Sequence, residues 1–133
     1  MVDNPELQDF EVYKKNNPFM DHNNIEIVDV SEDKCTVRVN IVHESHNLHG
    51  YIHGGLLYSM ADVVCGIQSR VNGGTYVTQS SHINFLRNVT EGTIYCTTEV
   101  IKRGKTMVII HFQVKDENDR LLADGVMDYI RRS

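Results

Sequence analysis

The feature that most constrains this 133-residue chain is a single long apolar segment with helical spacing. After His53-Gly54-Gly55, apolar side chains recur every three to four residues, which predicts one wide apolar stripe. The stripe consists of Leu56, Leu57, Met60, Ala61, Val63, Val64, Cys65 and Ile67. We expect a mostly buried helix that ends near Val71-Asn72-Gly73-Gly74, a typical C-terminal stop. Such a stripe needs a large apolar surface to cover it.

The segments on both sides of this helix favour β-strands. Before it, residues 25–30 and 35–42 form a predicted hairpin around a polar turn at 31–34. After it come four β-rich runs that are divided by short polar turns, and short connections predict antiparallel neighbours. These runs are Thr75–Leu86, Thr93–Lys102, Thr106–Val114 and Leu121–Arg131. A short amphipathic helix is expected over residues 5–17, with Pro18 following its end.

These elements fit one domain over residues 1–133, since the length is that of a single domain. The antiparallel sheet is the only predicted element large enough to cover the apolar helix. It must therefore wrap around that helix. The sequence predicts an α+β class and a hotdog fold, in which an antiparallel sheet wraps around one long central helix.

Composition excludes several classes of function. The net charge of -5 argues against a nucleic-acid-binding protein, which normally presents a basic face. No apolar run approaches the roughly 20 residues of a membrane-spanning helix, and the first residues lack the features of a signal peptide. The three cysteines are odd in number and far apart, which predicts no disulfide framework and a cytoplasmic location.

The start of the long helix carries the chemistry that the sequence predicts. Gly54 and Gly55 leave unpaired backbone N–H groups at the positive end of the helix dipole. Such donors suit the oxyanion that develops on a thioester carbonyl. Asp62 lies about two turns further along an otherwise apolar helix, so we expect it to face a cleft or a subunit interface. The alternatives are plain turn chemistry for the glycines and a solvated position for the aspartate.

The same stretch resembles the PaaI-type branch of the hotdog thioesterases. The residues that match the family motif at its spacing are Asn47, Gly50, His53, Gly54, Gly55, Ala61 and Asp62. The resemblance implies an enzyme that hydrolyses an acyl-CoA thioester to a free acid and CoA, with no cofactor. It also implies a homo-oligomer, in which a dimer with a shared site pairs into a tetramer.

The resemblance assigns roles to individual residues. Gly54 would donate its N–H to the thioester oxygen beside Gly55, and His53 would hold the loop or polarise the carbonyl. Asp62 would reach across a dimer interface as general base or nucleophile, a role that a carboxylate in a partly dry cleft can perform. Asn47 would position the water or the thioester from the facing subunit.

Two further sets of residues extend the predicted site. Relatives place a Ser or Thr near the start of the strand after the helix; Thr78 is the best match, and Ser80 and Ser81 are alternatives. The basic turn Arg103-Gly104-Lys105, preceded by Lys102, matches a position that contacts CoA phosphates in the family. A solvated hairpin turn is the alternative interpretation of these cations.

The loop histidines and the fold allow other interpretations. Four histidines at positions 43, 46, 49 and 53 suggest zinc, but the segment lacks the periodicity that would bring them to one side, so we predict no metal site. A hotdog hydratase or dehydratase would need a different arrangement of His and acid, which the sequence lacks. A non-catalytic acyl-CoA-binding module remains an alternative, although the presence of both Asn47 and Asp62 argues against a decayed site.

Overall fold

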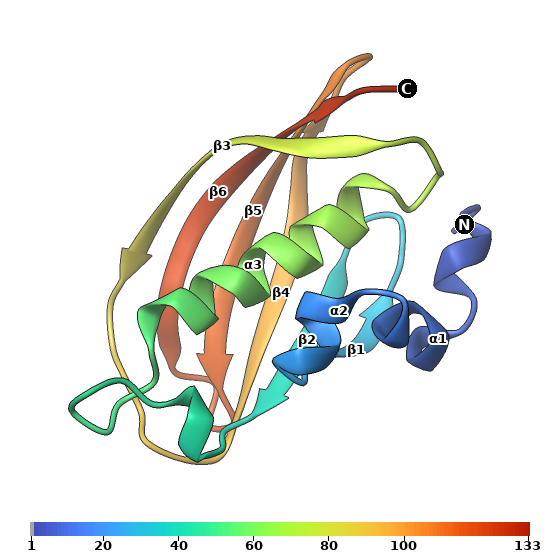
Figure 1. Cartoon of the computed structure of the whole chain (residues 1–133). Helices are drawn as coiled ribbons and strands as arrows, with labels where there is room; N and C mark the ends of the chain where they lie inside the picture. The colour runs from blue at the N-terminus through green and yellow to red at the C-terminus, as the bar shows by residue number, and fades with distance from the viewer. Residues whose placement is uncertain (1) are drawn as a thin grey trace.

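The computed structural model describes residues 2–133 and confirms the predicted α+β hotdog architecture. A six-stranded antiparallel sheet curves around one long helix, α3 (Figure 1). The strands, in chain order, are β1 (Glu26–Val30), β2 (Cys35–Asn40), β3 (Tyr76–Phe85), β4 (Thr93–Arg103), β5 (Met107–Asp116) and β6 (Leu121–Arg131). Their order in the sheet is β1-β2-β4-β5-β6-β3, so β3 and β1 form the two edges.

Helix α3 (Gly54–Ser69) buries its apolar stripe against the concave face of the sheet. The sheet supplies the matching surface because burial alternates along β5 and β6, as a strand with one covered face requires. Gly125 on β6 leaves no room for a side chain within the sheet, since a Cβ at this position would lie 2.2 Å from the carbonyl oxygen of His82 on β3. The core therefore sits between α3 and the sheet.

An irregularity in β3 decides which of its side chains reach the helix. The β3–β6 pairing matches Thr78 with Tyr129 and Ser80 with Asp128, so one extra residue lies between Thr78 and Ser80. This extra residue is a β-bulge, and a bulge shifts the alternation of faces along a strand. Thr78 and Ser81 consequently both point towards α3, whereas Ser80 points to the opposite face, where it donates to Asp128 Oδ2 at 2.7 Å.

The N-terminal helix differs from the prediction. The expected helix over residues 5–17 is two short pieces, η1 (Pro5–Leu7) and α1 (Phe10–Lys15), because the Asp9 side chain accepts from the N–H groups of Glu11 and Val12 and caps a new helix. Pro18 follows the end of α1, as expected, and it also begins a further helix, α2 (Pro18–His22), as suits proline at the first helical position.

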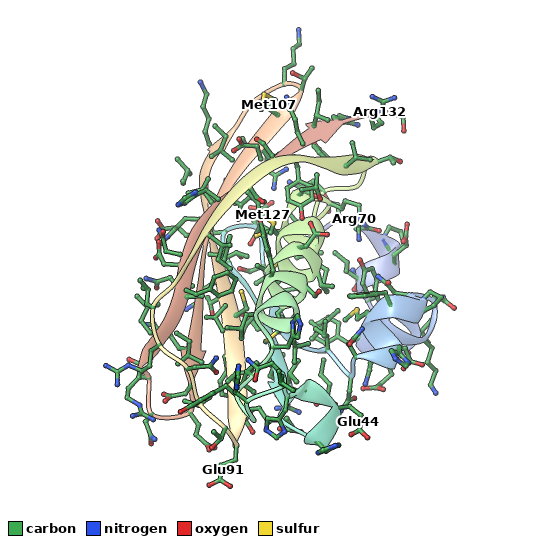
Figure 2. All side chains as sticks on the ribbon, turned by 60° about the vertical axis from the view of Figure 1, so that its left-hand side comes forward. Glu44, Arg70, Glu91, Met107, Met127 and Arg132 are labelled. Carbon is green, nitrogen blue, oxygen red and sulfur yellow. The ribbon has the colours of Figure 1, made fainter. Side chains whose placement is uncertain are left out.

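The predicted loop between β2 and α3 is confirmed, with one short turn inside it. That turn is η2 (His43–Ser45), and an isolated bridge joins His46 to Ile52. Figure 2 shows Glu44 of this loop and Glu91 at one end of the molecule, with Met107 and Arg132 at the other. None of the helices within residues 2–133 has the length and apolar character to cross a membrane.

Candidate active site

The first turn of α3 presents one unpaired backbone donor. His53 caps the helix: its Nδ1 accepts the N–H of Gly55 at 2.8 Å, and its carbonyl accepts the N–H of Leu56 at 3.0 Å. The bond from Gly55 requires Nδ1 to be unprotonated. Glycine at position 55 leaves room for this cap, because a Cβ would lie 2.8 Å from His53 Nδ1 and displace the ring. Within residues 2–133, the Gly54 N–H has no hydrogen-bond partner, so it alone of these three donors is free for a ligand.

Asp62 is an exposed carboxylate that is held by two hydroxyl groups. Its Oδ1 accepts from Thr78 Oγ1 at 2.7 Å and from the Tyr129 hydroxyl at 2.6 Å. Its Oδ2 receives no hydrogen bond from residues 2–133. Burial, together with the neighbouring Asp62 and Cys65, raises the pKa of Tyr129, which therefore stays protonated and donates. One carboxylate oxygen is thus fixed and the other is open.

This carboxylate lines an open cleft of about 550 Å³ between α2, α3, β3 and β6. The walls combine apolar side chains with hydroxyl groups, and Tyr58 contacts Ser81 across the cleft. In Figure 2, Met127 lies between the sheet and α3. The residues that line the cleft are Phe19, Gly55, Tyr58, Ser59, Asp62, Val63, Thr78, Ser81 and Met127. A second groove of about 480 Å³ shares Phe19, Gly55 and Ser59 and extends to His53.

Several predicted residues therefore meet, and others do not. Asp62, Thr78, Ser81 and Gly55 line one cleft, whereas the bulge directs Ser80 to the other face of the sheet. Tyr129 was missed by the sequence interpretation, although one signal was available. It lies on a core-facing position of β6, where a buried tyrosine needs a partner for its hydroxyl group.

Asn47 lies in the loop before α3 and is absent from the lining of the cleft. Its side-chain oxygen accepts the N–H groups of His49 at 2.9 Å and Tyr51 at 3.2 Å, which shapes the loop. Its amide nitrogen has no partner within residues 2–133. Asn88, which sequence reasoning missed, fixes the same loop through two bonds with the Ile52 backbone at 3.1 Å each. One chain alone does not bring Asn47 to Asp62.

The basic turn lies at the other end of α3, and its members have different surroundings. The Arg103 guanidinium donates to the carbonyls of Ser69 at 3.1 Å and Gln68 at 2.8 Å, so it closes the C-terminus of the helix. Gly104 forms the turn through its N–H bond to the Met107 carbonyl. Arg103 and Lys105 are both exposed, but the Arg103 guanidinium is held by these two carbonyls, so the Lys105 cation is the more accessible of the two to an anionic ligand.

The histidines of the loop do not converge. His46 Nε2 contacts the Thr90 carbonyl at 2.7 Å, and His53 is occupied as a helix cap. In the part of the chain that the structure describes, no three His, Cys, Asp or Glu side chains lie together as a metal-binding group.

Comparison with known proteins matches the thioesterase superfamily profile to residues 49–123, more than half of the chain. The chain is 29% identical over 102 residues to the putative esterase ComA2 of Bacillus subtilis, covering 74% of this chain and 81% of ComA2. It is 26% identical over 100 residues to the acyl-coenzyme A thioesterase PaaI of Escherichia coli, covering 74% and 71% of the two chains.

Solved structures share the fold. The E. coli PaaI structure superimposes with a TM-score of 0.91 at 21% identity, covering 100% of this chain and 97% of PaaI. The structure of smu.793 from Streptococcus mutans UA159, which is bound to acetyl CoA, gives a TM-score of 0.79 at 22% identity. That superposition covers 83% of this chain and 90% of smu.793.

Proposed function

Because this chain belongs to the thioesterase superfamily, we propose that it hydrolyses an acyl-CoA thioester to a free acid and CoA. The observation that carries the proposal is the Asp62 carboxylate, which lines an open cleft with one oxygen fixed and the other free. The named activity of PaaI and the acetyl CoA in the smu.793 structure support a CoA thioester as the substrate.

The residues suggest how the reaction proceeds. The Gly54 N–H donates to the carbonyl oxygen of the thioester and stabilises the oxyanion of the tetrahedral intermediate, aided by the helix dipole. Asp62 Oδ2 removes a proton from the attacking water, or attacks the carbonyl carbon itself to form an anhydride that water then hydrolyses. In both routes the C–S bond breaks and CoA leaves as the thiolate.

Spacing along α3 supports the proposal that two chains share each site. Asp62 lies eight positions after Gly54, which corresponds to about 12 Å along the helix axis. An oxyanion donor and a base that act on one carbonyl must both lie within a few ångströms of it. We therefore propose a dimer in which Gly54 of one chain faces Asp62 of the partner chain. Asn47, with its unpaired amide, would complete the site from the Gly54 side, and two such dimers would form the tetramer.

The proposed setting is the cytoplasm. Cys35, Cys65 and Cys96 are all buried free thiols. Burial raises the pKa of each thiol, which keeps it protonated and unreactive. Free thiols of this kind suit a reducing compartment.

The test is hydrolysis of short, medium, long and aromatic acyl-CoAs, followed by thiol release. We expect turnover of at least one member and its loss in Asp62→Asn, with binding of the CoA ester retained. The control is Asp33→Asn, which changes an exposed carboxylate in the β1–β2 turn. Undiminished turnover in Asp62→Asn would contradict the assigned role.

If the wild type hydrolyses none of these acyl-CoAs, a binding measurement separates two further outcomes. If CoA esters still bind, the chain is a binding module. If they do not bind, acyl-carrier-protein thioesters are the next substrates to assay.

A further inference from the structure

We propose that Tyr129 is a positioning residue for the reaction: it fixes Asp62 Oδ1 so that Oδ2 stays directed at the substrate cleft. This inference rests on the proposed thioesterase function for its catalytic consequence. The contact itself can be measured without turnover. Tyr129 lies beyond residues 49–123, the segment that matches the family profile.

The geometry comes from the pairing of two strands. Thr78 on β3 and Tyr129 on β6 are direct cross-strand partners, and both hydroxyl groups contact the same oxygen of Asp62. The Tyr129 hydroxyl also lies 2.8 Å from the backbone carbonyl of Asp62. The single phenolic proton is therefore shared between the side chain and the main chain of one residue, and this contact links β6 to the middle of α3.

Of the two hydroxyl donors, Tyr129 is the rigid one. Thr78 is exposed and its hydroxyl group can rotate about a single side-chain bond, whereas Tyr129 is only 3% exposed and its ring is packed in the core. A packed ring leaves the phenolic oxygen in one place, so the carboxylate it binds is held in one orientation. Pre-organisation of this kind is what a catalytic base requires.

The charged and titratable groups around Asp62 determine what loss of the Tyr129 hydroxyl group should do. The titratable groups facing it are Tyr58 and Cys65 from α3 and Tyr129 from β6. Among residues 2–133, no lysine, arginine, histidine or second carboxylate lines the cleft. A hydrogen bond donated to a carboxylate stabilises its charged form. Loss of the Tyr129 hydroxyl should therefore move the ionisation midpoint of this site to higher pH.

The variant is Tyr129→Phe, which keeps the ring and removes only the hydroxyl group. We expect kcat to fall by about tenfold to a hundredfold with little change in KM, since the lost bond is to a charged group. The acid limb of the pH profile of kcat/KM should move to higher pH. The control is Tyr13→Phe, another buried tyrosine, whose hydroxyl group contacts Arg70. It should lose stability without moving the limb.

Carbon-13 NMR titration of the Asp62 carboxyl group tests the contact independently of activity. The signal is assigned by its absence in Asp62→Asn, and its midpoint should be higher in Tyr129→Phe than in the wild type and Tyr13→Phe. If Tyr129→Phe does not fold, fluorine NMR of fluorotyrosine-labelled wild type replaces it. One tyrosine signal should then follow the titration of Asp62 and cease to do so in Asp62→Asn.

The outcomes separate the two proposals. A shifted carboxyl midpoint in a protein that hydrolyses no acyl thioester would refute the proposed function while the Tyr129–Asp62 coupling stands. Turnover with an unchanged midpoint, kcat and acid limb in Tyr129→Phe would overturn the positioning role and leave Tyr129 as a core residue only.

Discussion

The two ends of α3 differ in whether their backbone hydrogen-bonding groups have partners. At the C-terminal end, Arg103 donates to the Gln68 and Ser69 carbonyls, and the Gln68 side chain donates to the carbonyls of Ser31 and Glu32. At the N-terminal end, the Gly54 N–H has no partner within residues 2–133. The chain thus satisfies the end that holds the fold together and leaves a donor unpaired where a ligand is proposed to bind.

Removal of the unpaired Gly54 N–H should have the largest effect on activity. Gly54 is the first helical residue, where proline is favoured, and His53 has the extended backbone (φ -64°, ψ 128°) that a residue before proline adopts. Gly54→Pro therefore deletes the N–H with little cost to folding. We expect kcat to fall by about 10²–10³-fold, the usual effect of losing one oxyanion donor.

The matched variant for this experiment is Gly54→Ala, which keeps the N–H and brings a Cβ to 3.4 Å from the Phe85 ring. It should lose far less activity than Gly54→Pro in the same assay. Equal losses in the two variants would show that the glycine matters for space and not for its donor.

Removal of the Arg103 cap at the C-terminal end of α3 should lower the stability of the fold. Arg103→Met leaves the Gln68 and Ser69 carbonyls without the guanidinium, and we expect the free energy of unfolding to fall by about 1–2 kcal/mol. Urea denaturation measures this change. Lys105→Met, in the same turn but without a hydrogen bond to the helix, should stay within about 0.5 kcal/mol of the wild type. Equal stability of Arg103→Met and the wild type would remove Arg103 from the cap.

The free energy of unfolding should also depend on alkaline pH, because Cys35 is a buried thiol. Burial raises the pKa of Cys35 to about 11, whereas an unfolded thiol ionises near 8.5. Between these values only the unfolded chain releases the proton, so stability falls as pH rises. Cys35 should contribute about 1.4 kcal/mol per pH unit to this fall. Urea denaturation at pH 8 to 10.5 should show a shallower decline for Cys35→Ala, and parallel declines would refute the assignment.

The smallest effect concerns Lys105 and the proposed phosphate contact. One exposed cation on a phosphate contributes little in water, so Lys105→Ala should raise KM for an acyl-CoA by about two- to fivefold and leave kcat unchanged. The increase should shrink at high salt. An unchanged KM at low ionic strength would favour the solvated hairpin turn that the sequence left as the alternative.

The fold could be predicted because one wide apolar stripe and short polar turns admit few arrangements. The chemistry at the start of α3 could be predicted in outline. Gly54 belongs to a His-Gly-Gly helix start, and Asp62 is a carboxylate within an otherwise apolar helix. The rest depends on tertiary contacts that sequence spacing does not record. Arg103 became a helix cap because β4 passes the end of α3.

The positions of Ser80 on β3 and Tyr129 on β6 also depend on tertiary contacts that the sequence does not record. The bulge that separates Ser80 from Thr78 changes which face each side chain occupies, and alternation alone cannot locate an inserted residue. Tyr129 is brought to Asp62 by strand pairing, at a separation of 67 residues. Pro18 illustrates a local limit, because a proline that follows one helix can also begin the next.

Gly54 and Asp62 are proposed to act on one thioester from different chains. Mixing two inactive variants, Gly54→Pro and Asp62→Asn, under conditions that allow subunit exchange tests this arrangement. Random pairing makes half of the dimers mixed, and each mixed dimer regains one intact site, so we expect about a quarter of wild-type activity. If each site uses both residues of a single chain, the mixture will remain as inactive as its parents.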